Sequence, residues 1–353
     1  MSGGIVAVNE PGPEVQIVAG MGGRIIHRLQ IDAYLNLFEI LRAQGFLILG
    51  ATFVDDPRVL QGLRPPDFRT MSMNNKGWLA WDARQRWREV AFAAGKSGHM
   101  PLMDLASRIA SVHRYSQMRL YDLATAYSLQ LRGHLHEGEA KEYQAFQDLN
   151  SFEVYKAIHA LFWELAVLRD VVAEFIAAFC FSQTGITSLK GLLKVLNKNR
   201  PADPLADEIL QATDQSSGGW IATFTSYRNF FTHVAPMEQA ANVARTVQDM
   251  RKLAGGISIP QIYYALPKDI DDLTHRRRRG ALFSSLEELG AASFRRHDRS
   301  TEPDALEYLH RCMDRFVELS LKLISRSPVA PKPIHIGPDD MIGEVRLTRE
   351  AAE

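Results

Sequence analysis

The sequence predicts a mainly α-helical protein, in which a helical bundle follows a smaller N-terminal region of α or α+β structure. Two observations predict this fold class. From residue 101 to residue 326, apolar side chains recur at helical spacing over most of the chain, as in Leu105, Ile109 and Val112. Before residue 99 the apolar runs are short and are separated by glycine and proline, which favours a smaller unit.

The domain organisation follows from the breaks between these patterns. Gly95–Met100 (GKSGHM) separates the two regions, and a proline-rich stretch follows the last amphipathic helix at Arg326. Inside the helical region we expect an extended segment at 257–266, after a helix at 240–253. The expected divisions are an N-terminal region, a helical domain and a C-terminal tail, at residues 1–98, 99–326 and 327–353.

Short elements are expected in the N-terminal region. Residues 1–29 show little periodicity and predict either a loose arm or a short hairpin. Apolar residues at helical spacing predict a helix over 31–43, and the apolar run 46–54 (FLILGATFV) predicts a strand. The proline-containing stretch 56–75 predicts a loop.

A tryptophan-rich helix is predicted over residues 78–94, with arginines among its aromatic residues. Two interpretations of this helix stay open. Tryptophan and arginine together can stack on and clamp a nucleic acid. An ordinary amphipathic helix instead buries its tryptophans and extends its arginine stems along the surface. The residues concerned are Trp78, Trp81, Trp87, Arg84, Arg86 and Arg88.

Composition and charge exclude several classes of protein. Lys plus Arg and Asp plus Glu both number 41, so the net charge is zero and a strongly basic nucleic-acid coat is excluded. Cys180 and Cys312 form no disulfide framework and have no metal-ligand spacing. The chain starts without a secretory signal pattern, and charged residues interrupt its longest apolar run, 157–181. We expect a cytoplasmic protein that does not enter a membrane and needs no metal or other cofactor.

The segment with the most chemical content is Trp220–His233 (WIATFTSYRNFFTH). It places a permanent cation, Arg228, beside the amide of Asn229 and five residues before the imidazole of His233. On one α-helix Asn229 lies one turn from His233, whereas Arg228 is rotated by about 140° from it at roughly 100° per residue. One chain therefore brings Arg228 to His233 only if the helix is unwound there. Two helices packed antiparallel about a two-fold axis could instead surround one cleft.

This Arg-Asn-x-x-x-His pattern, preceded by Tyr227 and followed by an apolar helix, resembles the Arg-x4-6-His signature of HEPN domains. The resemblance covers residues 100–326. It implies an all-helical HEPN-like bundle, a metal-independent endoribonuclease activity, a site assembled across a homodimer and products with a 2′,3′-cyclic phosphate. It also implies a toxin or phage-defence effector, for which a neutralising antitoxin protein is a possible partner.

RNA hydrolysis of this kind assigns a role to each group of the motif. The 2′-hydroxyl must lose a proton as it attacks, and His233 is the expected general base or acid. The phosphorane gains negative charge, which the planar fork of Arg228 can stabilise. Asn229 is expected to orient His233 or a phosphate oxygen, and Tyr227 to support the motif.

Carboxylates upstream are expected to hold Arg228 in place. In the apolar helix before the motif, Asp170 and Glu174 fall in the same narrow sector as His159. Polar groups inside an apolar helix need partners. The natural partners are Arg228 and His233 if the two helices pack side by side. The open alternative is that both carboxylates form ion pairs with other lysines or arginines.

Three basic stretches are candidates for RNA contact. Lys190 and Lys194 lie one turn apart on a predicted short helix, and a dense arginine run lies further along, with a second basic cluster at 295–299. In the functional interpretation, these stretches neutralise RNA phosphates, and the two arginine-rich stretches form a mobile loop that holds the RNA. As an alternative, they are solvated surfaces balanced by nearby acids. The arginine run consists of Arg276, Arg277, Arg278 and Arg279.

Two further functions remain open from the sequence. The chain can be a catalytically silent helical module that binds RNA or a protein, or it can be a scaffold that binds only proteins. RNA binding that depends on salt but yields no product would favour the first of these two. A helical dimer without affinity for RNA would favour the second.

Overall fold

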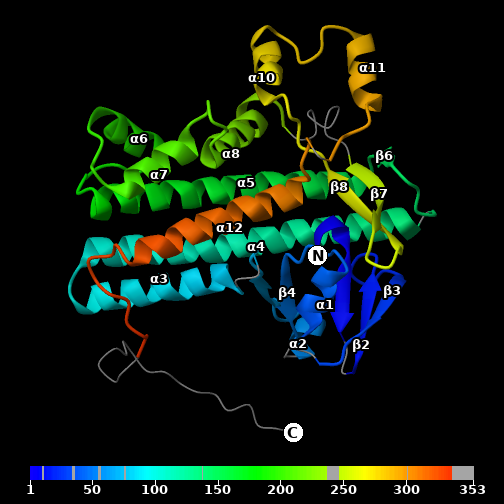
Figure 1. The fold of residues 1–353 in the computed structure, drawn as a ribbon, viewed down its shortest axis with the longest axis horizontal. Helices are drawn as coiled ribbons and strands as arrows, with labels where there is room; N and C mark the ends of the chain where they lie inside the picture. The colour runs from blue at the N-terminus through cyan, green and yellow to red at the C-terminus, as the bar shows by residue number, and fades with distance from the viewer. Residues whose placement is uncertain are drawn as a thin grey trace.

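The structure is a computed structural model, and it describes residues 1–9, 12–33, 36–54, 57–74, 77–136, 138–236, 246–299 and 301–335. The protein is largely helical, as predicted, and the described residues also form three small antiparallel sheets (Figure 1).

Long helices form the centre of the fold: α3 (Leu79–Lys96), α4 (Met100–His136) and α5 (Leu149–Phe175). They lie side by side in this order, and α12 (Ala305–Ile324) crosses them and contacts all three (Figure 1). Amphipathic sequences produce this arrangement, because each helix buries its apolar face against its neighbours.

Polar side chains mark where two of these helices begin. Asp148 and Ser151 form a reciprocal capping box at the start of α5, in which each side chain accepts the backbone N–H of the other residue. At the start of α12 the Asp304 carboxylate accepts a hydrogen bond from Glu307 N over 3.1 Å. Both caps satisfy backbone donors that have no partner inside the helix.

One hydrophobic core joins the helices to the N-terminal region. It extends from Ile5 to Ile324, and in it the ring of Trp87 on α3 lies 4.8 Å from the ring of Phe175 on α5. The boundary predicted at residue 98 coincides with the short turn between α3 and α4. Helix α3 nevertheless packs in the bundle, because α4 and α12 cover its apolar face.

The N-terminal region contains two of the sheets. The first comprises β1 (Val6–Asn9), β2 (Glu14–Val18) and β3 (Ile25–Gln30), and the second pairs β4 (Gly50–Phe53) with β5 (Asp67–Thr70). Residues 1–29 are therefore neither a loose arm nor a single hairpin. Gly20, with φ of +81°, lets the β2–β3 turn approach α4, since a Cβ there would lie 2.2 Å from Ser128 O.

Short helices accompany these strands. The predicted helix at 31–43 is observed as α1 (Leu37–Ala43), and the stretch predicted as a loop contains α2 (Pro57–Leu60). A 3-10 turn, η1 (Ser2–Gly4), packs against α4 and β8.

The third sheet lies at one end of the bundle and orders its strands as β6 (Gln144–Phe146), β7 (Thr246–Lys252) and β8 (Ser258–Tyr264). Strand β8 confirms the extended segment predicted there. The helix predicted at 240–253 is wrong for 246–252, and 237–245 lie outside the described residues. Strand β7 forms there because β6 and β8 pair with its two edges. In addition, the Gln248 side chain of β7 accepts a hydrogen bond from Lys141 N over 2.7 Å.

Shorter helices cover α5 on the side away from α3 (Figure 1). These helices are α6 (Leu189–Lys198), α7 (Pro204–Thr213) and α8 (Trp220–Asn229). Two more short helices come later in the chain, α10 (Ile270–Arg278) and α11 (Leu286–Phe294). Two π-helical turns, η3 (Ile176–Cys180) and η4 (Phe230–Val234), continue α5 and α8. In the described part of the chain, no helix has the length and apolar character that crossing a membrane requires.

Two histidines are fully buried in the core and are neutral there. Trp87 Nε1 donates to Ser320 Oγ over 2.6 Å, and the Ser320 hydroxyl lies 2.7 Å from His113 Nε2. His310 Nε2 lies 2.8 Å from Met71 O. Burial lowers the pKa of His113 to about 3 and that of His310 to about 4.

We expect the free energy of unfolding to fall as the pH drops from about 6.5 toward 4, because histidine titrates near 6.5 in an unfolded chain. The unfolded state therefore binds more protons in this window, and each histidine contributes a slope of at most about 1.4 kcal/mol per pH unit. Urea unfolding across this range measures the slope. His113→Gln should reduce it. Equal slopes in wild type and His113→Gln would contradict the prediction.

Candidate functional site

The predicted motif lies where α8 changes into the π-helical turn η4. Ala235 N donates to Phe230 O over 3.0 Å, which is the i to i+5 hydrogen bond of a π turn. In this wider turn, residues five apart take the stacked positions that residues four apart take in an α-helix. Arg228 and His233 are five residues apart. The local backbone therefore brings their side chains to the same side.

The two side chains meet within one chain. Arg228 Nη1 lies 3.4 Å from His233 Nε2 and donates to Asn229 Oδ1 over 3.1 Å. The prediction that an α-helix points Arg228 away from His233 does not apply, because the helix is widened at this point. Asn229 holds the arginine rather than the imidazole. A guanidinium only donates, so His233 Nε2 is the acceptor in this contact.

Arg228 has no carboxylate partner among the described residues. Its guanidinium instead lies over the ring of Trp163 on α5, with Cζ 5.1 Å from the ring centroid. The Nε atom of Arg228 is buried and has no hydrogen-bond acceptor in the described part of the chain. A cation held by an aromatic ring keeps its charge available to an anionic ligand.

Trp163 is a residue of this site that the sequence patterns did not indicate. Its side chain is 56% exposed, although α5 is otherwise strongly apolar. It lies one turn after His159 on the same face of α5, and His159 packs edge-on against Phe231 at 6.1 Å between ring centroids. Burial lowers the pKa of His159. Periodicity alone cannot distinguish an exposed tryptophan from a buried one, so only the packing of α8 on α5 identifies it.

Aromatic side chains anchor the π turn from the inside. Phe230 and Phe231 are buried, and the Tyr227 ring stacks on Phe231 at 6.3 Å. The Tyr227 hydroxyl donates to Pro267 O over 3.0 Å, and burial raises the pKa of Tyr227. Tyr227 thus supports the motif by tying α8 to the segment after β8, as a structural contact.

The prediction that Asp170 or Glu174 holds Arg228 is wrong within this chain. Glu174 accepts two hydrogen bonds from Arg108 of α4, at 3.0 and 2.7 Å. Asp170 pairs with Arg169 and accepts Leu189 N at the start of α6 over 3.1 Å. Residues on one helix sector can face different neighbours, and here the sector faces α4 and α6. Both carboxylates therefore form the ion pairs that were the open alternative.

Of the predicted RNA-contacting residues, some are exposed and one is neutralised. The arginine run forms the end of α10 rather than a loop, and Arg276 pairs with Asp272 and Glu288. Lys190 and Lys194 are exposed on α6. Helix α10 contacts both α8 and η4, so its arginines lie on an element that touches the motif. The exposed arginines of this run are Arg277, Arg278 and Arg279.

Ion pairs and an aromatic contact hold the second basic cluster, at 295–299, against the rest of the fold. Glu302 is fully buried and pairs with Arg295 and His297, while the Arg296 guanidinium lies 4.6 Å from the Tyr143 ring centroid. Burial alone would raise the pKa of Glu302, but hydrogen bonds from His297, Arg295 and the Asp298 amide lower it to about 2. These contacts overturn the expectation that this cluster is a mobile loop.

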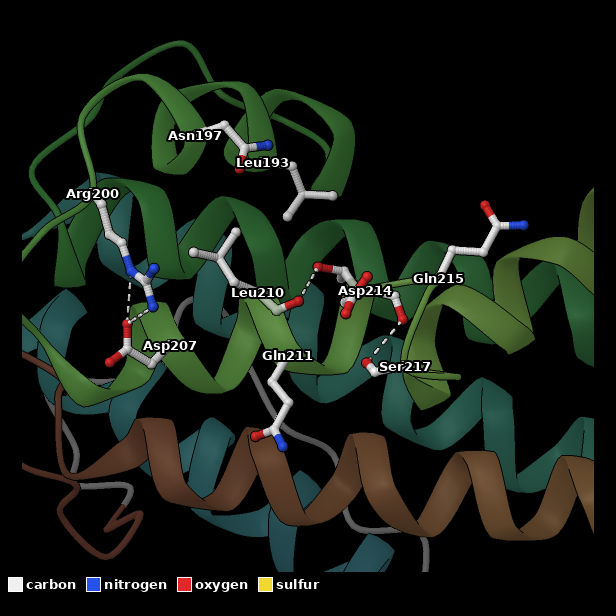
Figure 2. Close-up of a pocket in the computed structure, with 10 residues that line it drawn as sticks. Leu193, Asn197, Arg200, Asp207, Leu210, Gln211, Asp214, Gln215 and Ser217 are labelled. Carbon is white, nitrogen blue, oxygen red and sulfur yellow. Dashed lines mark hydrogen bonds and ion pairs between the residues drawn. The ribbon is translucent and has the colours of Figure 1, made fainter.

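A separate hollow lies between α6 and α7, with a volume of about 770 Å³ (Figure 2). Arg200 and Asp207 pair at its edge, and Asp214 accepts hydrogen bonds from the nearby Ser216. These polar groups are satisfied by one another, so the hollow holds no free cation or base. The motif on η4 is the stronger candidate site.

No known protein family, curated protein or solved structure matches this chain. Among the described residues, no group of three or more His, Cys, Asp and Glu side chains converges as a set of metal ligands.

Proposed function

We propose that this protein is a metal-independent endoribonuclease of the HEPN type, a cytoplasmic effector in a toxin or phage-defence system. One observation carries the proposal. Arg228, without a carboxylate partner in the described part of the chain, lies 3.4 Å from His233 on a π turn. A guanidinium that no carboxylate neutralises can stabilise negative charge on a phosphodiester, and an imidazole beside it can transfer a proton.

The proposed reaction uses the 2′-hydroxyl of the RNA as the nucleophile. His233 takes the hydroxyl proton or gives a proton to the leaving 5′-oxygen. Arg228 stabilises the phosphorane as its negative charge increases. Asn229 keeps the guanidinium in position through the 3.1 Å hydrogen bond. The products are a 2′,3′-cyclic phosphate and a free 5′-hydroxyl, so atoms and protons balance without a further reactant.

A single histidine cannot easily serve both proton transfers, and a homodimer would supply the second one. The outer face of α4 and α5 is the candidate interface. On α5, Trp163 and Val167 are exposed one turn apart; on α4, Tyr115 and Met118 are exposed. The hydrogen bonds between Arg108 and Glu174 join these same faces of the two helices. Since Trp163 also contacts Arg228, burying this face would place two motifs near one another.

RNA contact outside the motif would come from exposed lysines and arginines. Helix α10, which contacts η4, carries the arginine run at its C-terminal end, and Lys190 and Lys194 are exposed on α6. Because the chain has no net charge, affinity for RNA would depend on such local surfaces and would fall as salt increases.

The test is incubation of purified protein with total RNA in EDTA, with analysis of the fragment ends. Cleavage that leaves cyclic phosphate ends supports the proposal. Arg228→Lys keeps the charge but loses the planar fork, so we expect a reduction in kcat of about 10² to 10³. Arg200→Lys, which alters an exposed arginine paired with Asp207, is the matched control. Intact RNA with wild type, or full activity in Arg228→Lys, would contradict the proposed mechanism.

A second function is favoured by the exposed arginines of α10. A non-catalytic helical module would use Arg277–Arg279 to bind RNA or an acidic partner protein without cleaving anything. Gel-shift titration against salt distinguishes this case, since it predicts a salt-sensitive complex and no product ends. A neutralising antitoxin protein would bind to the same exposed positive surface.

A further inference from the structure

A second arginine-rich surface lies on the hairpin of α3 and α4. Two guanidinium groups lie over the ring of Trp81 on α3, those of Arg69 on β5 and Arg84 on α3. Their Cζ atoms lie 4.6 and 5.4 Å from the ring centroid. Arg69 also lies over Phe53, at 4.9 Å. Aromatic contacts of this kind hold a guanidinium in place without neutralising its charge.

Two more arginines add to this charge. Arg88 lies one turn after Arg84 on α3, and Arg114 of α4 lies close enough to Arg84 to repel it. Burial first, and then the repulsion from Arg114 and Arg88, lowers the pKa of Arg84, while Asp67 acts in the opposite direction. Asp67 itself pairs with Arg69. In the described part of the chain, Arg84, Arg88 and Arg114 have no ion pair.

The neighbouring arginines of the same two helices are different. Arg86 pairs with Glu89, Arg119 pairs with Asp122, and Arg108 pairs with Asp104 and Glu174. These three arginines therefore have carboxylate partners, whereas Arg84, Arg88 and Arg114 have none in the described part of the chain. Like charges held together raise the energy of the free protein, and an anionic ligand that binds between them lowers it.

We propose that Arg84, Arg88 and Arg114, together with Trp81 and Arg69, form a binding site for the backbone of a single-stranded nucleic acid. Planar guanidinium forks match phosphate oxygens. The half-buried ring of Phe53 lies against Arg69 and 5.8 Å from the half-buried ring of Trp78, and both rings offer surfaces for bases, which an acidic peptide would not use. The site lies apart from Arg228 and His233 and does not depend on RNA cleavage.

The two interpretations of the tryptophan-rich helix apply to different tryptophans, and the nucleic-acid one is part of this proposal. Trp87 is fully buried and belongs to the core, as an ordinary amphipathic helix requires. Trp81, six residues earlier, is only half-buried and faces the arginines. The helix therefore contributes Trp87 to the core, and in this proposal it contributes Trp81 to the binding site.

The test is fluorescence anisotropy with a labelled single-stranded DNA of mixed sequence. DNA lacks the 2′-hydroxyl, so the proposed cleavage cannot remove the probe, and failure of the ribonuclease proposal would not affect the result. We expect Arg88→Gln/Arg114→Gln to weaken binding roughly tenfold and to reduce the salt slope by about 1.4, as expected for two lost phosphate contacts on a single strand. Both side chains are exposed, so the fold should be retained.

Arg86→Gln/Arg119→Gln is the matched control, since it removes the same charge from the same two helices. Unchanged or nearly unchanged binding in this control supports the site. Equal losses in the two double variants, or no binding by wild type, would overturn the proposal. A polyglutamate that displaces the DNA at equal charge concentration would also overturn it, in favour of an acidic protein partner.

Discussion

Replacing His233 with alanine is expected to reduce RNA cleavage by at least about 10³, because the substitution removes the only imidazole next to Arg228 in the described part of the chain and with it the proton transfer. His233 is exposed, so the fold should not change. The measurement is the initial rate of cleavage of a defined RNA in EDTA. Thermal unfolding confirms that the variant is folded.

The control for this prediction is His136→Ala, which removes another exposed histidine, from the end of α4. Its cleavage rate should equal that of wild type. A His233→Ala variant that cleaves RNA as fast as wild type would remove His233 from the mechanism.

Mixing two inactive variants tests whether the site is shared between protomers. If two chains contribute to one site, His233→Ala and Arg228→Ala proteins should exchange subunits and recover part of the activity. If each chain has a complete site, the mixture should remain as inactive as its components. The mixing experiment tests the proposed homodimer independently of the proposed reaction, because the single variants already test the reaction.

Replacing Asp304 with alanine is expected to lower the free energy of unfolding by roughly 3 to 5 kcal/mol. The buried Asp304 carboxylate accepts hydrogen bonds from the Tyr127 hydroxyl and from Tyr264 N, both at 2.9 Å, and it also caps α12 through Glu307 N. Alanine would leave a buried hydroxyl and a buried amide without acceptors. Urea unfolding at constant pH measures the change.

Two controls separate the contributions to this value. Asp304→Asn keeps one acceptor oxygen for the Tyr127 hydroxyl and Tyr264 N but loses the acceptor for Glu307 N, so it should cost less than Asp304→Ala. Asp203→Ala removes a half-buried helix cap at α7, which also pairs with Arg326, and should cost about 1 kcal/mol. A loss in Asp304→Ala no larger than that in Asp203→Ala would show that the buried hydrogen bonds contribute nothing.

Sequence periodicity was enough to predict the helical class, the extended segment at β8 and the exposed basic residues of α6 and α10. These features depend on spacing within ten to twenty residues, which one segment contains completely. The chemistry of the motif was also visible in the order of Arg228, Asn229 and His233. Spacing left two geometries open for this motif, an unwound helix within one chain or a pair of helices, and the π turn brings the two side chains together within one chain.

Tertiary structure decided what depends on distant segments. Strand β7 exists because β6 and β8 pair with it, and Glu174 binds Arg108 of α4 while Asp170 accepts Leu189 N of α6 because these are the helices that α5 faces. The π turn forms where Phe230 and Phe231 are buried, and it sets the Arg228 to His233 distance. Partner choice among charged groups follows from packing, since electrostatic energy depends on the distances that only the folded chain defines.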